Sequence, residues 1–171
     1  MTERNETVTF QGNPLTLVGQ ELKAEDPAPD ATLLDNELNE VKLSGHAGGV
    51  RVLVAVPSLD TSVCDAEARR FNEEAGKLGG DVKVLVISMD LPFAQARWCG
   101  AAGIEHVQTL SDHRDASFGE AYGVLIKELR LLARSIFVVG PDDKVKYVQL
   151  VNEMTDEPDY DEVLAAVRAL M

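Results

Sequence analysis

Two apolar runs give the clearest pattern in the chain. Residues 50–56 are almost continuously apolar, and Val82–Ser88 has the same character. Neither run alternates like a half-exposed strand or repeats with the helical period, so each fits a strand covered on both faces. Residues 107–112 (VQTLSD) are a third, weaker strand candidate. Together these segments predict the core of a sheet.

Helical patterns follow each of these runs. Residues 64–78 have an apolar side that includes Ala68 and Phe71, and Gly79-Gly80 is expected to end this helix. Pro92 suits the first turn of a second helix, which runs to about residue 102. We also expect a short helix within 115–123 and an amphipathic helix within 158–171.

The remaining segments predict hairpins and connections. Residues 8–11 and 15–18 alternate in polarity around Gly12-Asn13-Pro14, which is a strong turn signal. Residues 25–35 contain two prolines and are expected to form a connector. Residues 37–49 are expected to supply a short strand and a glycine-rich loop.

The order of these elements predicts the fold class. Strand–helix–strand units with short links favour right-handed crossovers and a parallel core, and two strands around a turn at 140–143 then add an antiparallel hairpin. We expect an α/β three-layer sandwich with a mixed sheet, a parallel core and an N-terminal β-hairpin extension. The length of 171 residues suits a single domain over 1–171.

Composition narrows the classes of partner. The formal net charge of −13 disfavours nucleic acid and anionic membranes, because both repel an acidic surface. No apolar stretch reaches about 18 residues, which argues against a transmembrane helix. The N-terminal residues are polar and lack the hydrophobic core of a signal peptide. We therefore expect a cytoplasmic protein.

Candidate chemistry centres on two cysteines, Cys64 and Cys99. Two are too few for a disulfide scaffold, so they are either inert buried thiols or a redox pair. Cys64 lies where the first apolar strand gives way to a helix. The carboxyl end of a strand is the usual ligand position in α/β sheets, and a helix N-terminus stabilises a thiolate. This placement alone is also compatible with a packing role.

Residues around Cys64 sharpen this interpretation. Pro57 fixes the backbone where the strand ends. Thr61 has the spacing to direct its hydroxyl at the sulfur or at a bound substrate oxygen, or to cap the helix, and both roles can apply at different moments. Asp60 and Asp65 oppose ionisation of the thiol. A cation from elsewhere in the chain is therefore needed.

The segment PSLDTSVC resembles the Pro-x-x-x-Thr-x-x-Cys signature of the peroxiredoxins, with Pro57, Thr61 and Cys64 in place. The longer run SLDTSVCDAEARRFN is similar to the thiol peroxidase branch of that family. FQGNPLTLVGQ, APDATL, RWCG, YGVLI, LLARSIFVVG and EPDYDEVL extend the resemblance, in order, over nearly the whole chain. The resemblance implies a thioredoxin-like fold.

The resemblance also implies a function and its residues. Cys64 would be the peroxidatic cysteine, oxidised by hydrogen peroxide or organic hydroperoxides to a sulfenic acid. The arginine of the LLAR run, Arg134, would stabilise the thiolate and hold the peroxide. Cys99 would resolve the sulfenic acid as an intramolecular disulfide, which thioredoxin or a similar dithiol would reduce. The family further implies a homodimer, and the chemistry requires no cofactor.

Residues outside this set receive simpler interpretations. The three histidines lack ligand spacing, so we expect no metal site. Surface positions are expected for six other arginines, namely Arg51, Arg69, Arg70, Arg97, Arg114 and Arg130. Ser58 and Ser62 are interpreted as polar residues of the turn.

Three apolar residues, Leu91, Phe93 and Trp98, are candidates for an apolar collar that favours organic hydroperoxides, although a tryptophan is more often part of the core. A dimer surface could include Leu59, Val63, Trp98 or Leu125.

The geometry of a disulfide limits how Cys64 and Cys99 can react with each other. A disulfide needs Cα atoms within about 7 Å, which two cysteines on successive packed helices need not satisfy. We therefore predict free thiols in the reduced form and local unwinding around Cys64, Cys99 or both during oxidation. Gly100 and Gly103 weaken the second helix and make it a plausible moving part.

Three alternatives to a peroxidase stay open at this point. A redox sensor on the same fold would consume about one peroxide per molecule, whereas an enzyme turns over repeatedly. A cysteine hydrolase would need a histidine base, and none of the three histidines falls near a strand carboxyl end. A structural domain would have two inert thiols.

Overall fold

The structure is a computed structural model that describes residues 1–79 and 81–171. Its strands are β1 (Glu3–Phe10), β2 (Asn13–Val18), β3 (Thr32–Leu34), β4 (Glu40–Lys42), β5 (Val50–Ala55), β6 (Val82–Ser88), β7 (Gln108–Ser111), β8 (Leu125–Ile126), β9 (Leu131–Leu132), β10 (Ser135–Val139) and β11 (Val145–Leu150). Its helices are the 3₁₀ helix η1 (Leu43–His46) and the α-helices α1 (Ser62–Leu78), α2 (Pro92–Ala102), α3 (Ser117–Ala121) and α4 (Tyr160–Arg168).

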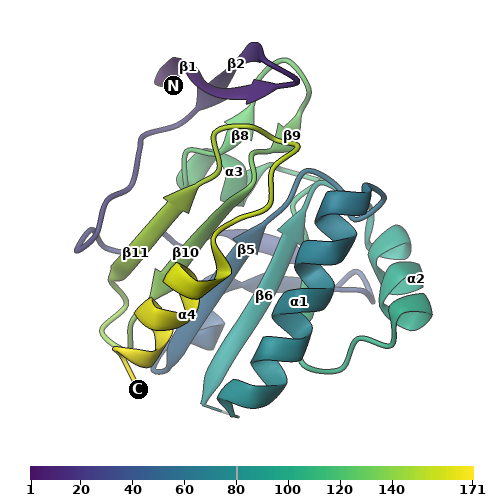
Figure 1. The fold of residues 1–171 in the computed structure, drawn as a ribbon, viewed down its shortest axis with the longest axis vertical. Coiled ribbons are helices and arrows are strands. Elements are labelled where there is room, and N and C mark those ends of the chain that lie inside the picture. The colour runs from purple at the N-terminus through teal and green to yellow at the C-terminus, as the bar shows by residue number, and fades with distance from the viewer. Residues whose placement is uncertain (80) are drawn as a thin grey trace.

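A mixed seven-stranded sheet forms the middle of the molecule, in the order β11-β10-β5-β6-β7-β3-β4 (Figure 1). Strands β5, β6 and β7 are parallel, as the strand–helix–strand pattern predicts. Strand β10 pairs antiparallel with both β5 and β11, and β3 pairs antiparallel with β7. The predicted parallel core with an added antiparallel hairpin is thus confirmed.

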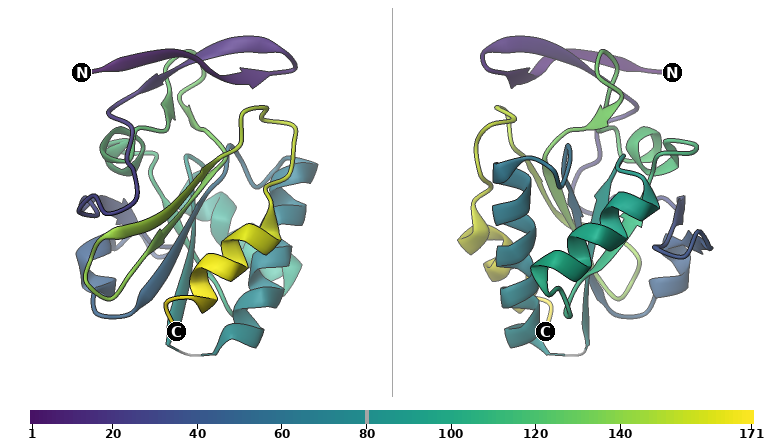
Figure 2. Two further views of the ribbon diagram at one scale, coloured as in Figure 1. Left: turned by 60° about the vertical axis from the view of Figure 1, so that its left-hand side comes forward. Right: turned by 90° about the vertical axis from the view of Figure 1, so that its right-hand side faces the viewer.

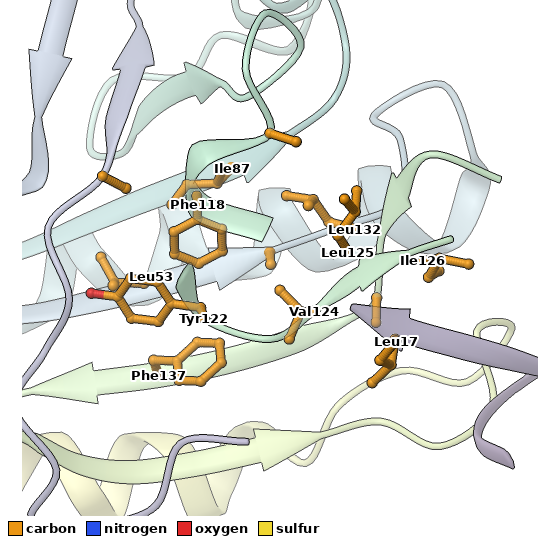
Figure 3. Close-up of a cluster of buried hydrophobic side chains, with 14 of the residues drawn as sticks. Leu17, Leu53, Ile87, Phe118, Tyr122, Val124, Leu125, Ile126, Leu132 and Phe137 are labelled. Atoms are coloured by element: carbon orange, nitrogen blue, oxygen red, sulfur yellow. The ribbon is translucent and has the colours of Figure 1, made fainter. Parts of the chain in front are cut away.

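Alternate side chains of β5 serve two separate cores, which is why the run is apolar throughout. Val52 and Val54 belong to the cluster under α1 and α4. Leu53 and Ala55 belong to the cluster on the other face, where Phe118 of α3 packs (Figure 3). Each fully buried aliphatic side chain stabilises the fold by about 1.5–3 kcal/mol. Helices on both faces of the sheet make the three layers that the sequence predicts.

The N-terminal hairpin lies across one end of the molecule, opposite the C-terminus (Figure 2). Strands β1 and β2 join β8 and β9 in a second, four-stranded sheet. The sequence placed the turn at Gly12-Asn13-Pro14, and this was wrong. The turn residues are Gln11 and Gly12, with φ of 50° and 83°. Two left-handed residues give the twist that a tight hairpin needs, so Asn13 and Pro14 already belong to β2.

Other differences from the expected elements are local. The expected connector 25–35 contains β3, and the expected loop after β4 contains η1. Strands β8 and β9 were not predicted, because each has two residues and depends on a partner strand. Helix α1 begins at Ser62, two residues before the expected start, and Gly79 is its C-cap. Gly80, the other expected helix stop, lies outside the described residues.

Within the described residues, no helix has both the length and the apolar character to cross a membrane.

Candidate active site

The loop between β5 and α1 presents Cys64 at the start of a helix. Buried Pro57 follows the strand, and the chain turns so that the Thr61 N–H donates to the Ser58 carbonyl at 3.1 Å. Thr61 is the N-cap of α1, and its Oγ1 accepts the Cys64 backbone N–H at 3.2 Å. The same hydroxyl donates to the Ser58 carbonyl at 3.0 Å. Here its proton therefore goes to the backbone, so the capping alternative describes this state.

The Cys64 thiol is fully buried and faces a cation. Nη1 of Arg134 donates to Sγ of Cys64 at 3.4 Å, although seventy positions separate the two residues in the chain. Arg134 lies just before β10, is itself buried, and donates from Nη2 to the Met154 carbonyl at 2.7 Å. Burial works to lower the pKa of Arg134, but Glu67 and Cys64 outweigh it and raise that pKa. The cation that the sequence required is thus beside the sulfur.

Glu67 completes this buried group and was missed as a site residue. Its Oε2 accepts from Nη1 of Arg134 at 2.5 Å, and its side chain is fully buried. Burial raises the pKa of Glu67 to about 7, although the Arg134 guanidinium opposes the rise. The sequence did carry a signal, because Glu67 stands one turn after Cys64 on the apolar side formed by Ala68 and Phe71. A carboxylate on a buried helix face requires a partner.

One guanidinium nitrogen therefore serves two acceptors, the sulfur of Cys64 and the carboxyl of Glu67. When both acceptors are ionised, they share a single positive charge in a buried setting. The arrangement can hold a thiolate, or another developing negative charge beside the sulfur, without exposing it to water.

Asp90 fixes the active-site loop from the end of β6. Its carboxylate accepts from the Ser58 hydroxyl at 2.7 Å and from the Leu59 backbone N–H at 2.8 Å. Ser88 also donates to it at 2.7 Å, and Gln95 of α2 donates to the Ser88 hydroxyl at 3.0 Å. Ser58 is therefore more than the turn polarity that the sequence indicated, because it fastens the loop to the neighbouring strand.

Cys99 lies apart from this group, on α2. Its half-buried Sγ is 3.4 Å from the Thr109 hydroxyl and 4.0 Å from Nδ2 of Asn36. Thr109 in turn donates to Oδ1 of Asn36 at 2.9 Å. The sulfur borders a cavity of about 350 Å³ that includes Asp35 and Gln108 in its lining. Both cysteines are free thiols, and α1 and α2 are intact, as predicted for the reduced form.

Outside this group, the burial of several side chains differs from what the sequence predicts. Arg51 is buried rather than at the surface, because it lies on the central strand β5 and pairs with Asp143 at the β10–β11 turn. Leu59 and Leu125 are buried in the core, which contradicts their suggested place on a dimer surface. Phe93 is exposed, as are Leu91 and the side chains of several arginines.

Trp98 is half-buried and packs against the cluster that contains Cys64, and its indole N–H bonds to Asp65. Among the described residues, no group of three or more histidine, cysteine, aspartate or glutamate side chains is arranged to hold a metal ion.

Known proteins resemble this chain over most of its length. The Redoxin family matches residues 23–164. A thiol peroxidase of Bacillus subtilis (strain 168) is 60% identical over 164 residues, covering 96% of this chain and 98% of that protein. A thiol peroxidase of Staphylococcus aureus (strain MRSA252) is 55% identical over 161 residues, covering 94% of this chain and 97% of that protein.

Solved structures extend the comparison to the fold. The crystal structure of a peroxiredoxin-like protein from Aquifex aeolicus has a TM-score of 0.91 and 46% identity, covering 97% of this chain and 98% of that one. A thiol peroxidase from Chromobacterium violaceum has a TM-score of 0.84 at 21% identity, covering 95% of both chains, and so bears on the fold alone. These likenesses confirm the thioredoxin-like fold that the sequence predicts.

Proposed function

Because the chain belongs to the Redoxin family and is a peroxiredoxin of the thiol peroxidase branch, we propose that Cys64 is its peroxidatic cysteine. The protein is a thiol-dependent peroxidase, an oxidoreductase of antioxidant defence. One observation carries the assignment of Cys64: its fully buried thiol lies 3.4 Å from the guanidinium of Arg134. An inert buried thiol needs no cation, whereas a reacting thiolate does.

In the first step the Cys64 thiolate attacks one oxygen of the hydroperoxide. An S–O bond forms, the O–O bond breaks, and sulfur gives up two electrons. The products are a sulfenic acid on Cys64 and, once the leaving oxygen has gained a proton, an alcohol or water. Arg134 stabilises the thiolate beforehand and the charge on the leaving oxygen in the transition state. Its planar fork suits it to serve two acceptors at once.

Thr61 and Pro57 prepare this site for the peroxide. We assign two successive roles to the Thr61 hydroxyl. Without substrate it caps α1 through the Cys64 N–H, and with substrate it donates its proton to a peroxide oxygen. Its position three residues before the sulfur supports both roles. Pro57 fixes the backbone at the end of β5, so the loop that carries Thr61 starts from a rigid point.

In the second step the Cys99 thiol attacks the sulfenic acid. An S–S bond forms between Cys64 and Cys99, the S–O bond breaks, and the hydroxyl leaves with the thiol proton as water. The two sulfurs lie on separate, intact helices, and each has its own hydrogen-bond partner elsewhere in the fold, so the step requires local unwinding. A dithiol then reduces the disulfide by exchange and returns both thiols.

The relatives support a peroxide substrate and a thioredoxin-type reductant. We propose more specifically that thioredoxin itself is the reductant and that hydrogen peroxide and organic hydroperoxides are substrates. Exposed Leu91 and Phe93 follow Asp90, which binds the active-site loop, and they support the organic hydroperoxides. We also propose that the protein is a cytoplasmic homodimer and that each chain forms a single domain over residues 1–171.

Peroxide turnover coupled to NADPH through thioredoxin and its reductase tests the assignment in the native chain, Cys64→Ser and Cys99→Ser. We expect Cys64→Ser to show no turnover, and Cys99→Ser to consume about one peroxide per chain and then recycle poorly. Full activity in Cys64→Ser would refute the proposal. Consumption of a single equivalent by the native chain, with reductant present, would instead support a redox sensor.

A further inference from the structure

One hydrogen bond joins the immediate neighbours of the two cysteines. Nε1 of Trp98 donates to Oδ1 of Asp65 at 2.6 Å. Asp65 directly follows Cys64 on α1, and Trp98 directly precedes Cys99 on α2. The two helices lie beside each other (Figures 1 and 2). Any motion that brings Cys99 to Cys64 changes the position of at least one member of this pair.

The setting of this hydrogen bond favours its strength. Its acceptor is a carboxylate, and hydrogen bonds to charged groups are stronger than neutral ones. The indole is half-buried against the cluster that holds Cys64, which limits competition from water. Nε of Arg69 also lies 3.0 Å from both oxygens of Asp65, but this pair within α1 is partly exposed to water and contributes little.

Helix α2 has few other anchors in the half that carries Cys99. Its buried residues, Pro92 and Gln95, are in the first half. Gln95 fastens that half to β6 and β7, by donating to the Ser88 hydroxyl and to the Leu110 carbonyl. In the second half, the side-chain hydrogen bonds among the described residues are those of Trp98 with Asp65 and of Cys99 with Thr109 and Asn36, and the Trp98 indole also packs against the cluster that holds Cys64.

We propose that Asp65 and Trp98 are positioning residues for the resolving step. Their hydrogen bond keeps α2 folded against α1 while Cys64 reacts with peroxide, and it must break before Cys99 reaches the sulfenic acid. This inference rests on the proposed roles of Cys64 and Cys99. The bond therefore sets the lifetime of the sulfenic acid. A longer lifetime gives a second peroxide more time to oxidise Cys64 to the sulfinic acid, with release of a second alcohol or water.

The test measures disulfide formation after a single addition of peroxide to the reduced protein. Samples are quenched with a thiol-alkylating reagent, and the disulfide and sulfinic forms are counted by mass spectrometry. The variants are Trp98→Phe, Asp65→Ala and the double variant. Arg69→Ala is the matched control, because it removes the other partner of Asp65 and leaves the indole. Trp98 is the single tryptophan of the chain, so its fluorescence gives a second readout wherever it is retained.

We expect Trp98→Phe and Asp65→Ala each to speed disulfide formation by about ten- to 100-fold, as loss of one hydrogen bond to a charged group implies. The double variant should be no faster than either single variant. Arg69→Ala should keep the native rate. Asp65→Asn keeps an acceptor oxygen and should fall between the native chain and Asp65→Ala. The faster variants should also yield less sulfinic acid.

Three results would overturn the inference: unchanged disulfide rates, single effects that multiply in the double variant, or equal acceleration by Arg69→Ala. Multiplied effects would mean general loosening instead of one shared bond. These failures differ from failure of the proposed function. If the native chain forms no Cys64–Cys99 disulfide with peroxide, the roles of the cysteines are wrong. If it forms the disulfide and all variants match it, those roles stand and this positioning role does not.

Discussion

Helices α1 and α2 carry one thiol each, but the fold anchors them differently. Helix α1 has 17 residues, a side-chain cap at Thr61 and six buried residues, including Cys64 and Glu67. Helix α2 has 11 residues, no side-chain cap at Leu91 and two buried residues. On the proposed mechanism, Cys64 reacts as a thiolate beside a guanidinium and needs a fixed setting. Cys99 must instead travel to its partner and needs a helix that opens at small cost.

This difference in anchoring indicates which helix unwinds during oxidation, whereas the sequence alone allowed unwinding of either helix or both. Regions with few buried contacts open at lower free energy than the rest of a fold. Opening α1 separates Cys64, Glu67 and Arg134 and leaves buried charges without partners, which is costly. Opening the second half of α2 releases the contacts of Trp98 and Cys99. We therefore expect most of the movement in α2.

Removing the guanidinium should have the largest effect. On the proposed mechanism, Arg134→Met leaves the thiolate without its cation and the leaving oxygen without a donor. We expect the rate of peroxide reduction in a single turnover to fall by about 100- to 1000-fold. Glu67 would also be buried without a partner, at a cost of about 3–5 kcal/mol in the free energy of unfolding.

A second variant separates these two consequences. Arg134→Met combined with Glu67→Gln removes the unpaired carboxylate, so part of the stability should return while the peroxide rate stays low. Rates are measured by rapid mixing and stability by chemical denaturation. If the double variant also recovered the peroxide rate, Arg134 would act through folding alone. Arg130→Met, an exposed arginine nearby in the chain, is the control and should leave both quantities near native values.

Glu67 anchors α1 either as one half of an ion pair or as a neutral carboxyl, and the pH dependence of stability distinguishes the two. Burial raises the pKa of Glu67 to about 7, from an ordinary value of 4.5. The folded protein therefore holds this proton more tightly than the unfolded chain does. The stability that Glu67 contributes is fully present below about pH 4.5 and is lost as the pH rises through about 7.

Glu67→Gln does not titrate and provides the reference. We expect the free energy of unfolding of the native chain, relative to Glu67→Gln, to decrease by up to about 3 kcal/mol between about pH 5 and about pH 8. Urea denaturation of both proteins at each pH measures the difference. An increase instead would mean that attraction to Arg134 outweighs burial and keeps Glu67 ionised. The anchor of α1 would then be a full ion pair.

Sequence patterns located the local part of this site well. Pro57, Thr61 and Cys64 are close in the chain, so the strand-to-helix junction brings them together by itself. Long apolar runs predicted β5 and β6, because burial on both faces leaves little freedom in composition. Arg134 came from the resemblance to a family, and the structure places this distant cation beside the Cys64 sulfur.

Long-range partners could not be predicted in the same way. Asp90 looks like an ordinary loop carboxylate until the fold brings Ser58 and Leu59 to it. Arg51 looked exposed, because an arginine usually is, and its burial depends on Asp143 at a distant turn. The bond between Asp65 and Trp98 has the same character, since each residue alone has a simpler interpretation. Such contacts depend on how elements pack, and spacing in the chain does not encode them directly.

Small changes in the helix propensity of α2 and α1 should have the smallest effect, and they show directly which helix opens. Gly100 lies inside α2, and a Cβ placed there would meet open space. Gly100→Ala should stabilise α2 by about 0.5–1 kcal/mol and slow disulfide formation by about two- to fivefold. Ala101→Gly at an exposed position should speed it by a similar factor, while Ala66→Gly, the same change at an exposed position of α1, should not. A change in helix propensity alters the rate of disulfide formation only if that helix unfolds in the rate-limiting step. Equal acceleration by Ala66→Gly would therefore show that α1 also opens before the thiols meet.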